Sequence, residues 1–231
     1  MSENKIIILP AFNEGRTISS VISNVKKYSD ADVLVVDDGS TDDTLVKIEN
    51  AGVEYLIKHK KNRGYGRSLI HGFNFAFKKG YQKIVTMDCD AQHEPGRVEE
   101  FFLNIGEFDI VSGSRYLNSV PQFSGAPMQR IHINNIITEK INKITGYELT
   151  DAFCGFKGYN AEKLEKLKLD ISGYGMPLQL WIQASNKVLT VKEVPVSIIY
   201  HSRACFPGKL ASPEERLKYY NQIIENETAK V

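Results

Sequence analysis

The segment Val33-Leu34-Val35-Val36-Asp37-Asp38-Gly39-Ser40-Thr41-Asp42 places four aliphatic residues directly before two carboxylates and a turn. An apolar run this short, which does not alternate with polar residues, predicts a strand buried on both faces of a sheet. Three other segments have the same character and are also predicted strands: Lys5–Leu9, Lys83–Met87 and Asp109–Val111.

Apolar residues with helical spacing lie between and after these predicted strands. Thr17–Tyr28 carries them at i, i+3, i+4 and i+7, and Leu69–Phe77 and Val98–Ile105 show further apolar faces. Strands that alternate with helices predict βαβ units and a doubly wound, mostly parallel α/β sheet. Ligands of such sheets bind beyond the carboxyl ends of the strands, where the strand order switches.

The second half of the chain is less regular. Ser119–Pro127 is rich in Pro, Gly and Ser and is predicted to be a loop. Ile131–Ile144 and Pro213–Ile224 are predicted helices, and Val188–Val196 is a strand pair or one strand that ends at Pro195. Because no repeat or domain boundary is visible, residues 1–231 are expected to form a single domain.

The charge of the chain is balanced overall but segregated along the sequence. The 231 residues include 29 Lys and Arg and 28 Asp and Glu, a formal net charge of +1, which argues against a nucleic-acid binder and against disorder. Residues 30–54 hold eight acidic residues and one basic residue, residues 56–83 hold eight basic and no acidic residues, and residues 84–109 hold seven acidic and one basic. Such blocks fit either solvated surface or a cleft that presents carboxylates to a metal ion and cations to phosphates.

Neither a membrane span nor a disulfide framework is expected. The first apolar run, Ile6–Leu9, is far shorter than the roughly 18 residues that cross a bilayer. The three cysteines, Cys89, Cys154 and Cys205, are far apart and form no CxxC pair. We therefore expect a protein of the reducing cytoplasm.

Acidic clusters follow three of the predicted strands. They are Asn13-Glu14, Asp37-Asp38 and Asp88-Cys89-Asp90, and Gln92 and His93 lie just beyond the third. Mg²⁺ and Mn²⁺ take oxygen ligands, often one or two carboxylates together with substrate phosphates. The complete dinucleotide fingerprint, the P-loop, the nucleophile elbow and the HExxH motif are all missing from the sequence.

Six segments in register resemble the motifs of family 2 glycosyltransferases. The order and spacing agree from Lys5 to about Leu210, and three of the segments resemble the polyprenyl-phosphate branch, similar to dolichol-phosphate mannose synthase. The segments are Ile8–Glu14 ("PxYNE"), Val35–Asp42 ("VVDDGSxD"), Asn62–Gly66 ("NxGxG"), Met87–Pro95 ("MDADxQHxP"), Gly113–Tyr116 ("GSRY") and Asp151–Phe156 ("DxxxGF").

The resemblance implies a GT-A fold and an inverting enzyme. The enzyme would move a sugar from a nucleotide-sugar donor, of the GDP-mannose or UDP-glucose type, to a polyprenyl or dolichyl phosphate. Residues 1–115 would bind the nucleotide sugar and residues 116–231 the acceptor. Two alternatives stay open: transfer to a saccharide or other hydroxyl acceptor, and a catalytically silent module that binds sugar nucleotides. The sequence does not determine the oligomeric state.

The resemblance also implies roles for individual residues. Asp88, Asp90 and Gln92 would hold Mg²⁺ or Mn²⁺ against the donor diphosphate. The expected catalytic residues are Asp90, Arg115 and Asp151. The expected substrate-binding residues are Pro10, Ala11, Phe12, Glu14, Val36, Asp38, Asp88, Cys89, Arg130, Arg203 and Lys209.

The chain departs from the family pattern at three places. Gln179 lies near the position of an acidic residue in many relatives; because glutamine cannot act as a base, it mildly favours a phosphate acceptor, which needs none. Asp151 is then a base for an alcohol acceptor or a loop cap. Gly208 replaces the serine that usually precedes the lysine of the basic loop. No membrane helix follows the catalytic region, so we expect a peripheral enzyme on the cytoplasmic face of a membrane, contacting it through the basic block and Pro121–Met128.

Overall fold

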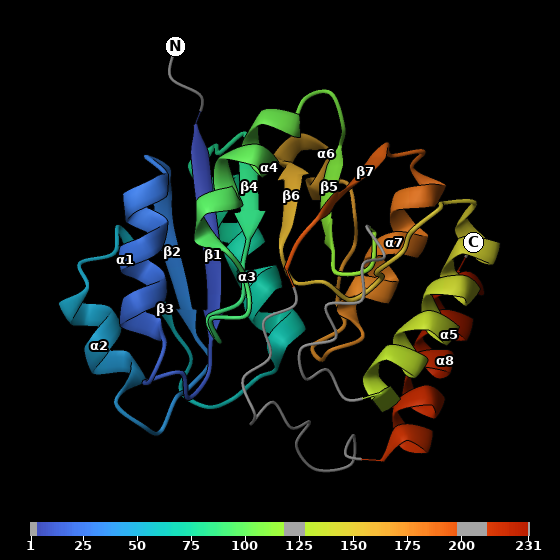
Figure 1. Ribbon diagram of the computed structural model, residues 1–231, viewed down its shortest axis with the longest axis horizontal. Coiled ribbons are helices and arrows are strands. Elements are labelled where there is room, and N and C mark those ends of the chain that lie inside the picture. The colour runs from blue at the N-terminus through green and yellow to red at the C-terminus, as the bar shows by residue number, and fades with distance from the viewer. Residues whose placement is uncertain (1–3, 118–127, 198–211, 231) are drawn as a thin grey trace.

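The computed structural model describes residues 4–117, 128–197 and 212–230. Within them, seven strands form one sheet in the order β3-β2-β1-β4-β6-β5-β7 (Figure 1). Neighbouring strands are parallel except for β6, which is antiparallel to both β4 and β5. The strands are β1 Lys5–Ala11, β2 Asp32–Asp37, β3 Tyr55–Lys58, β4 Lys83–Thr86, β5 Ile110–Ser114, β6 Lys157–Asn160 and β7 Val191–Pro195.

Helices cover both faces of the sheet and make a three-layer fold (Figure 1). One apolar core lies between the sheet and α1, α2 and α4, and the other lies between the sheet and α3, α5, α6, α7 and α8. The helices are α1 Ile18–Tyr28, α2 Thr44–Asn50, α3 Tyr65–Lys79, α4 Val98–Asn104 (after a 3₁₀ turn, Pro95–Arg97), α5 Met128–Thr145, α6 Ala161–Glu165, α7 Met176–Asn186 and α8 Pro213–Thr228. None of the helices in these described residues is long and apolar enough to span a membrane.

Strand β1 shows why the sequence has unbroken apolar runs. Ile6 and Ile8 belong to one core and Ile7 and Leu9 to the other, and all four are 0% exposed. Each buried aliphatic side chain stabilises the fold by about 1.5–3 kcal/mol. A strand covered on both sides has no polar face, so its sequence does not alternate.

The doubly wound, mostly parallel sheet predicted from the sequence is confirmed. All four predicted strands are present, with β1 extending to Ala11 and β5 to Ser114. Within Val188–Val196 there is one strand, β7 Val191–Pro195, which ends at Pro195 as the second alternative predicted; Val188 lies in the turn before it, with a positive φ of 56°. Strands β3 and β6 and helices α2, α6 and α7 were not predicted from the sequence.

The carboxyl ends of β1, β2, β4 and β5 meet at one edge of the sheet, since these strands run parallel. Strand β6 runs the opposite way, so its amino end, preceded by residues 151–156, reaches the same edge. Five segments that are distant in sequence therefore surround a common space.

Candidate functional site

Asp38 follows β2 and organises the loop that leads into α3. Its carboxylate accepts hydrogen bonds from the backbone N–H groups of Arg63 and Gly64, both at 2.8 Å, and from His59 Nδ1 at 2.6 Å. The residue is only 3% exposed. Asp38 therefore fixes the backbone just before α3, which borders the site described below.

Glycines at the start of α3 allow close packing against residues 171–173. A Cβ at Gly64, whose φ is 102°, would lie 2.4 Å from the carbonyl oxygen of Ser172, and a Cβ at Gly66 would lie 2.3 Å from that of Ile171. Between them, the ring of Tyr65 stacks on the ring of Tyr174 at 5.6 Å. The motif glycines thus bring Tyr65 to the strand ends.

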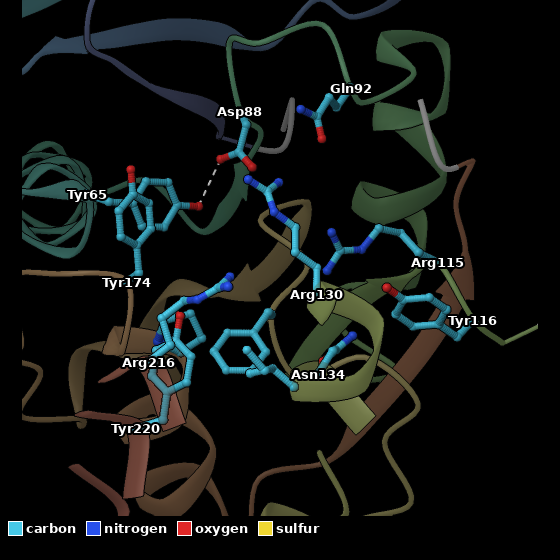
Figure 2. A pocket seen from close by; sticks show the side chains of 13 residues that line it. Tyr65, Asp88, Gln92, Arg115, Tyr116, Arg130, Asn134, Tyr174, Arg216 and Tyr220 are labelled. Carbon is cyan, nitrogen blue, oxygen red and sulfur yellow. Dashed lines mark hydrogen bonds between the residues drawn. The ribbon is translucent and has the colours of Figure 1, made fainter. Parts of the chain in front are cut away.

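Asp88 lies beyond the end of β4, where Tyr65 and Gly155 fix its position. Tyr65 Oη donates to Asp88 Oδ1 at 2.9 Å (Figure 2). On the other side there is no room for a side chain, because a Cβ at Gly155 would lie 2.3 Å from Asp88 Oδ2. Burial raises the pKa of Asp88, against the lowering effect of the Tyr65 hydrogen bond.

Negative charge accumulates around Asp88. Asp90 Oδ1 accepts a hydrogen bond from the backbone N–H of Gln92 at 3.0 Å, in a turn where Ala91 has a φ of 60°. The pKa of Glu14 rises to about 7, first through burial and further through the charges of Asp90 and Asp88. A divalent cation would relieve this repulsion, and carboxylate and amide oxygens are the donors that hard cations take. The described residues contain no cluster of three or more His, Cys, Asp or Glu that could hold a metal by itself.

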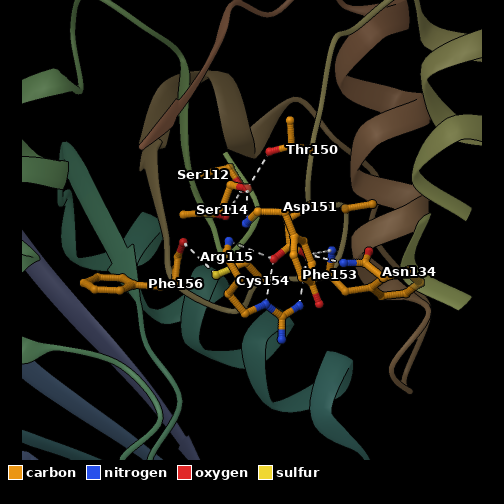
Figure 3. Close-up of polar contacts among 12 residues, drawn as sticks. Ser112, Ser114, Arg115, Asn134, Thr150, Asp151, Phe153, Cys154 and Phe156 are labelled. Carbon is orange, nitrogen blue, oxygen red and sulfur yellow. Dashed lines mark hydrogen bonds and ion pairs between the residues drawn. The ribbon is translucent and has the colours of Figure 1, made fainter. Parts of the chain in front are cut away.

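Arg115 follows β5 and forms an ion pair with Asp151, which precedes β6 (Figure 3). Arg115 donates through Nε to Oδ2 at 2.6 Å and through Nη2 to Oδ1 at 2.9 Å. Asp151 also accepts from Asn134 Nδ2 at 3.0 Å and from the N–H of Phe153 at 3.1 Å. Although burial by itself would raise the pKa of Asp151, the Arg115 guanidinium lowers it below its ordinary value. These donors keep the Asp151 carboxylate ionised, and the carboxylate in turn fixes the position of the arginine side chain.

These groups border a cavity of about 160 Å³ between the strand ends and helices α5 and α8. Figure 2 shows Arg115 and Arg130 pointing into the space below Asp88, with Arg216 on the opposite side. The cavity lining is Tyr65, Asp88, Gln92, Arg115, Tyr116, Arg130, Ile133, Asn134, Phe153, Tyr174, Pro177, Arg216 and Tyr220.

The structure thus brings together Asp88, Gln92, Arg115 and Arg130 of the predicted site. The other lining residues were not part of the predicted site, and among them are Arg216 and Tyr220 of α8. No motif marks these two, and only the assembled helix shows which face of α8 turns inward.

Several other predicted residues lie near the strand ends without lining the cavity. Pro10 and Ala11 end β1, and Phe12, just beyond, is 42% exposed. The side chains of Val36 and Cys89 are packed in the apolar cores, so only their backbones can face a ligand. Predicted residues Arg203 and Lys209 lie outside the described residues, as do Cys205 and most of Pro121–Met128.

The prediction that Gln179 lies at the position of a base is wrong, so this residue gives no argument for a phosphate acceptor. It is 0% exposed and is not part of the cavity lining. Its Oε1 accepts from the N–H groups of Asp170 and Ile171, and its Nε2 donates to Asp170 Oδ1 and Glu227 Oε2. Gln179 joins α7 to α8 and says nothing about the acceptor.

Comparisons with known proteins agree with this architecture. Over 84% of its length, the chain is 28% identical to the UDP-N-acetylglucosamine–dolichyl-phosphate N-acetylglucosaminyltransferase of Methanococcus voltae, covering 85% of that protein. It is 26% identical to the polyprenol monophosphomannose synthase of Mycolicibacterium smegmatis, over 85% of this chain and 77% of that one.

Among solved structures, glucosyl-3-phosphoglycerate synthase from Mycobacterium tuberculosis, in complex with Mn²⁺, UDP-glucose and phosphoglyceric acid, shares the fold. The TM-score is 0.76 at 19% identity, over 99% of this chain and 80% of that chain. The model of glycosyl transferase family 2 matches residues 6–168. The chain therefore belongs to glycosyl transferase family 2 and is a glycosyltransferase with a GT-A-like fold.

Proposed function

We propose that this enzyme transfers a sugar from a nucleotide-sugar donor to a polyprenyl phosphate, with inversion at the anomeric carbon. The main observation that supports this proposal is the cavity lined by Asp88, Arg115 and Arg130. The names of two relatives support this class of acceptor: one names dolichyl phosphate, and the other names a polyprenol monophosphomannose.

The donor would lie over the ends of β1, β2 and β4. Pro10, Phe12 and Glu14 would border the nucleotide, and Asp38 would act there by fixing the loop before α3. A GDP-mannose or UDP-glucose type of donor is part of the proposal. Residues 1–115 would form the donor half and residues 116–231 the acceptor half.

Asp88, Asp90 and Gln92 would hold Mg²⁺ or Mn²⁺ against the donor diphosphate. Their oxygen donors fit such a cation, and the raised pKa of Glu14 beside them reflects burial and the negative charge of Asp90 and Asp88. The structural neighbour mentioned above holds Mn²⁺ in its complex, which supports the assignment. When bound, the ion supplies charge stabilisation for the leaving diphosphate.

In this mechanism, an oxygen of the acceptor phosphate attacks the anomeric carbon, and the nucleoside diphosphate leaves from the opposite side. Arg115, held by Asp151, would stabilise the charge that develops between donor and acceptor. The acceptor phosphate is already ionised at neutral pH, so no base is required. This agrees with Asp151 serving as a positioning residue.

We also propose that the enzyme approaches its lipid acceptor as a peripheral protein at the cytoplasmic face. Met128, at the start of α5, is 72% exposed and precedes the cavity residue Arg130 by two positions. Tyr174, which lines the cavity, is 39% exposed, so more than one large apolar side chain near the cavity is open to solvent, which suits contact with a lipid surface.

A nucleotide-sugar screen tests the donor site. A ligand that binds only the folded state raises its stability. We expect one GDP- or UDP-sugar to raise the melting temperature only with Mn²⁺, and not in Asp90→Ala. Asp30→Ala, which removes an exposed aspartate, is the matched control. Equal stabilisation by every nucleotide sugar, with or without metal, would refute the donor assignment.

The acceptor is tested by supplying the same donor with undecaprenyl phosphate or undecaprenol in detergent. Transfer to the phosphate alone is expected. Transfer only to alcohols or soluble saccharides would refute the proposed acceptor. Full turnover by Asp90→Ala would refute the metal-site role of that residue.

A further inference from the structure

The acceptor cavity has more positive charge than Arg115 and Arg130 provide. Its described lining contains three arginines, from the end of β5, from α5 and from α8, and a single carboxylate, Asp88. Asp151 lies behind Arg115 and pairs with it. A cavity with this excess of guanidinium groups suits a phosphate monoester, which has a charge of about −1.5 to −2 at pH 7.

We propose that Arg216 of α8 binds the phosphate group of the acceptor and makes the enzyme select a phosphate over a hydroxyl. This inference rests on the proposed function and extends it to a helix that none of the sequence motifs includes. Arg216 is the third cationic side chain of the cavity, and it lies across the cavity from Arg115 (Figure 2).

The side chain of Arg216 is directed inward by the face of α8 on which it lies. Arg216 is 5% exposed, and Tyr220, one turn later and also part of the cavity lining, is 3% exposed. Lys218, on the same helix, is exposed to solvent. Long cationic side chains normally keep their charge in water, so an arginine in a cavity wall is well placed to meet an anion there.

Helix α8 is held in this orientation at both ends. At its start, Ser212 Oγ accepts from the N–H of Glu215 at 3.3 Å, and Pro213 occupies the first turn. Near its end, Glu227 accepts from Gln179 at 2.9 Å and from Gln183 at 2.5 Å, both on α7. Residues 216 and 227 are about three turns apart and so lie on one face. The contacts of Glu227 therefore fix the rotation of α8 that turns Arg216 inward.

The chemistry of guanidinium explains the selectivity. Each arginine can donate two parallel hydrogen bonds to phosphate oxygens, and together the three arginines could surround the group. A hydroxyl oxygen has two lone pairs and no negative charge, so it cannot satisfy three guanidinium groups. An alcohol has no negative charge and accepts fewer hydrogen bonds, so Arg216 would stabilise its binding less than that of a phosphate.

The test measures acceptor and donor binding separately in Arg216→Gln, Arg216→Lys and the control Lys218→Gln. The donor is the nucleotide sugar found in the screen, and the acceptor probe is undecaprenyl phosphate. Arg216→Gln is expected to raise the acceptor KM by about tenfold or more and to leave Mn²⁺-dependent stabilisation by the donor unchanged. Arg216→Lys should be intermediate, because it keeps the charge and loses the parallel hydrogen bonds, and Lys218→Gln should match the wild type.

An unchanged acceptor KM in Arg216→Gln, or an equal loss of donor binding, would overturn the inference while the proposed function stands. If Arg216→Gln shows no cooperative melting, the variant is not folded and the acceptor KM is measured in Arg216→Lys instead. An unchanged acceptor KM in Arg216→Lys overturns the inference.

If the wild type glycosylates only alcohols, the proposed function and the selection of phosphate over hydroxyl are both wrong. A binding measurement then decides the remaining part of the inference, the phosphate-binding role of Arg216. The phosphate-binding role stands on two results together. Farnesyl phosphate must raise the melting temperature of the wild type more than farnesol does, and Arg216→Gln or Arg216→Lys must reduce that difference. The phosphate-binding role is refuted when farnesyl phosphate and farnesol raise the melting temperature of the wild type equally, or when the two variants leave the difference between them unchanged.

Discussion

Replacing Asp151 with asparagine keeps the shape of the side chain and removes the charge that Arg115 pairs with. Asp151 is 0% exposed and accepts hydrogen bonds from Arg115, Asn134 and Phe153. Removing one partner of a fully buried ion pair costs about 3–5 kcal/mol. Because the Arg115 side chain is 20% exposed and keeps some hydration, we expect a loss in the free energy of unfolding of about 2–4 kcal/mol.

Thermal unfolding measures this loss. For a domain of this size, the expected fall in melting temperature is roughly 4–16 °C. The pKa of Asp151 is lowered in the folded state, so the ion pair stabilises the protein at neutral pH. That contribution is complete above the unfolded-state pKa, about 4, and disappears as the pH falls through the lower folded-state value. The gap between wild type and Asp151→Asn should therefore be constant near neutral pH and narrow in acid.

The matched control is Glu162→Gln, which breaks the exposed pair with Lys166. We expect a change within about 0.5 kcal/mol, as for other surface pairs. An Asp151→Asn variant as stable as this control would refute the positioning role. If, in addition, such a variant lost turnover completely, the result would indicate that Asp151 is a catalytic base and not a positioning residue.

Three further predictions concern the surroundings of the cavity. Gly155→Ala places a Cβ 2.3 Å from Asp88 Oδ2, so Mn²⁺-dependent donor stabilisation should fall sharply in thermal-shift assays. Glu14→Gln should raise the metal-free melting temperature at pH 8 and leave it unchanged below pH 4.5, because the raised pKa of Glu14, about 7, makes its ionised form unfavourable in the folded state. Gln179→Glu should lower the melting temperature without creating activity toward alcohols, because it sets a carboxylate against Glu227.

Each of these predictions has a defined failure. Gly96→Ala, where the nearest atoms to the new Cβ are 3.9 Å away, is the control for Gly155→Ala, and equal donor binding by both variants would contradict the packing argument. A Glu14→Gln effect that is the same at both pH values would show that ionisation of this group is not responsible. A gain of hydroxyl-acceptor turnover in Gln179→Glu would restore the base position that the structure removes.

The amino-acid sequence was sufficient to predict the strands that are buried on both faces. For β1, β2, β4 and β5, the apolar run and the polar residues after it are local features, and they locate both the strand and its functional end. The edge strand β3, Tyr-Leu-Ile-Lys, also has an apolar run, but it is only half-buried and is followed by basic residues rather than carboxylates. Strand β6, Lys-Gly-Tyr-Asn, looks like a turn, and its buried Lys157 is tolerated because Nζ donates to the carbonyl of Cys154 and lies 5.3 Å from the centre of the Trp181 ring.

The candidate site, too, was only partly predictable from the sequence. The motifs identified Asp88, Gln92 and Arg115, and the wider resemblance to the family identified Arg130; these positions follow strand ends and a helix start. The motifs did not reveal Arg216, because helical spacing predicts that a helix forms but not which of its polar residues face a cavity.

What the sequence by itself determined is the set of strands buried on both faces, the carboxylates at their ends and the family. What only the tertiary structure decided is which polar groups are already bound by the protein and which line the cavity. Asp151 is held by Arg115, 36 residues away, and Gln179 binds Glu227, 48 residues away. The physical reason is that secondary structure depends on neighbours along the chain, whereas the charge and hydrogen bonding of a buried side chain depend on partners brought to it by folding.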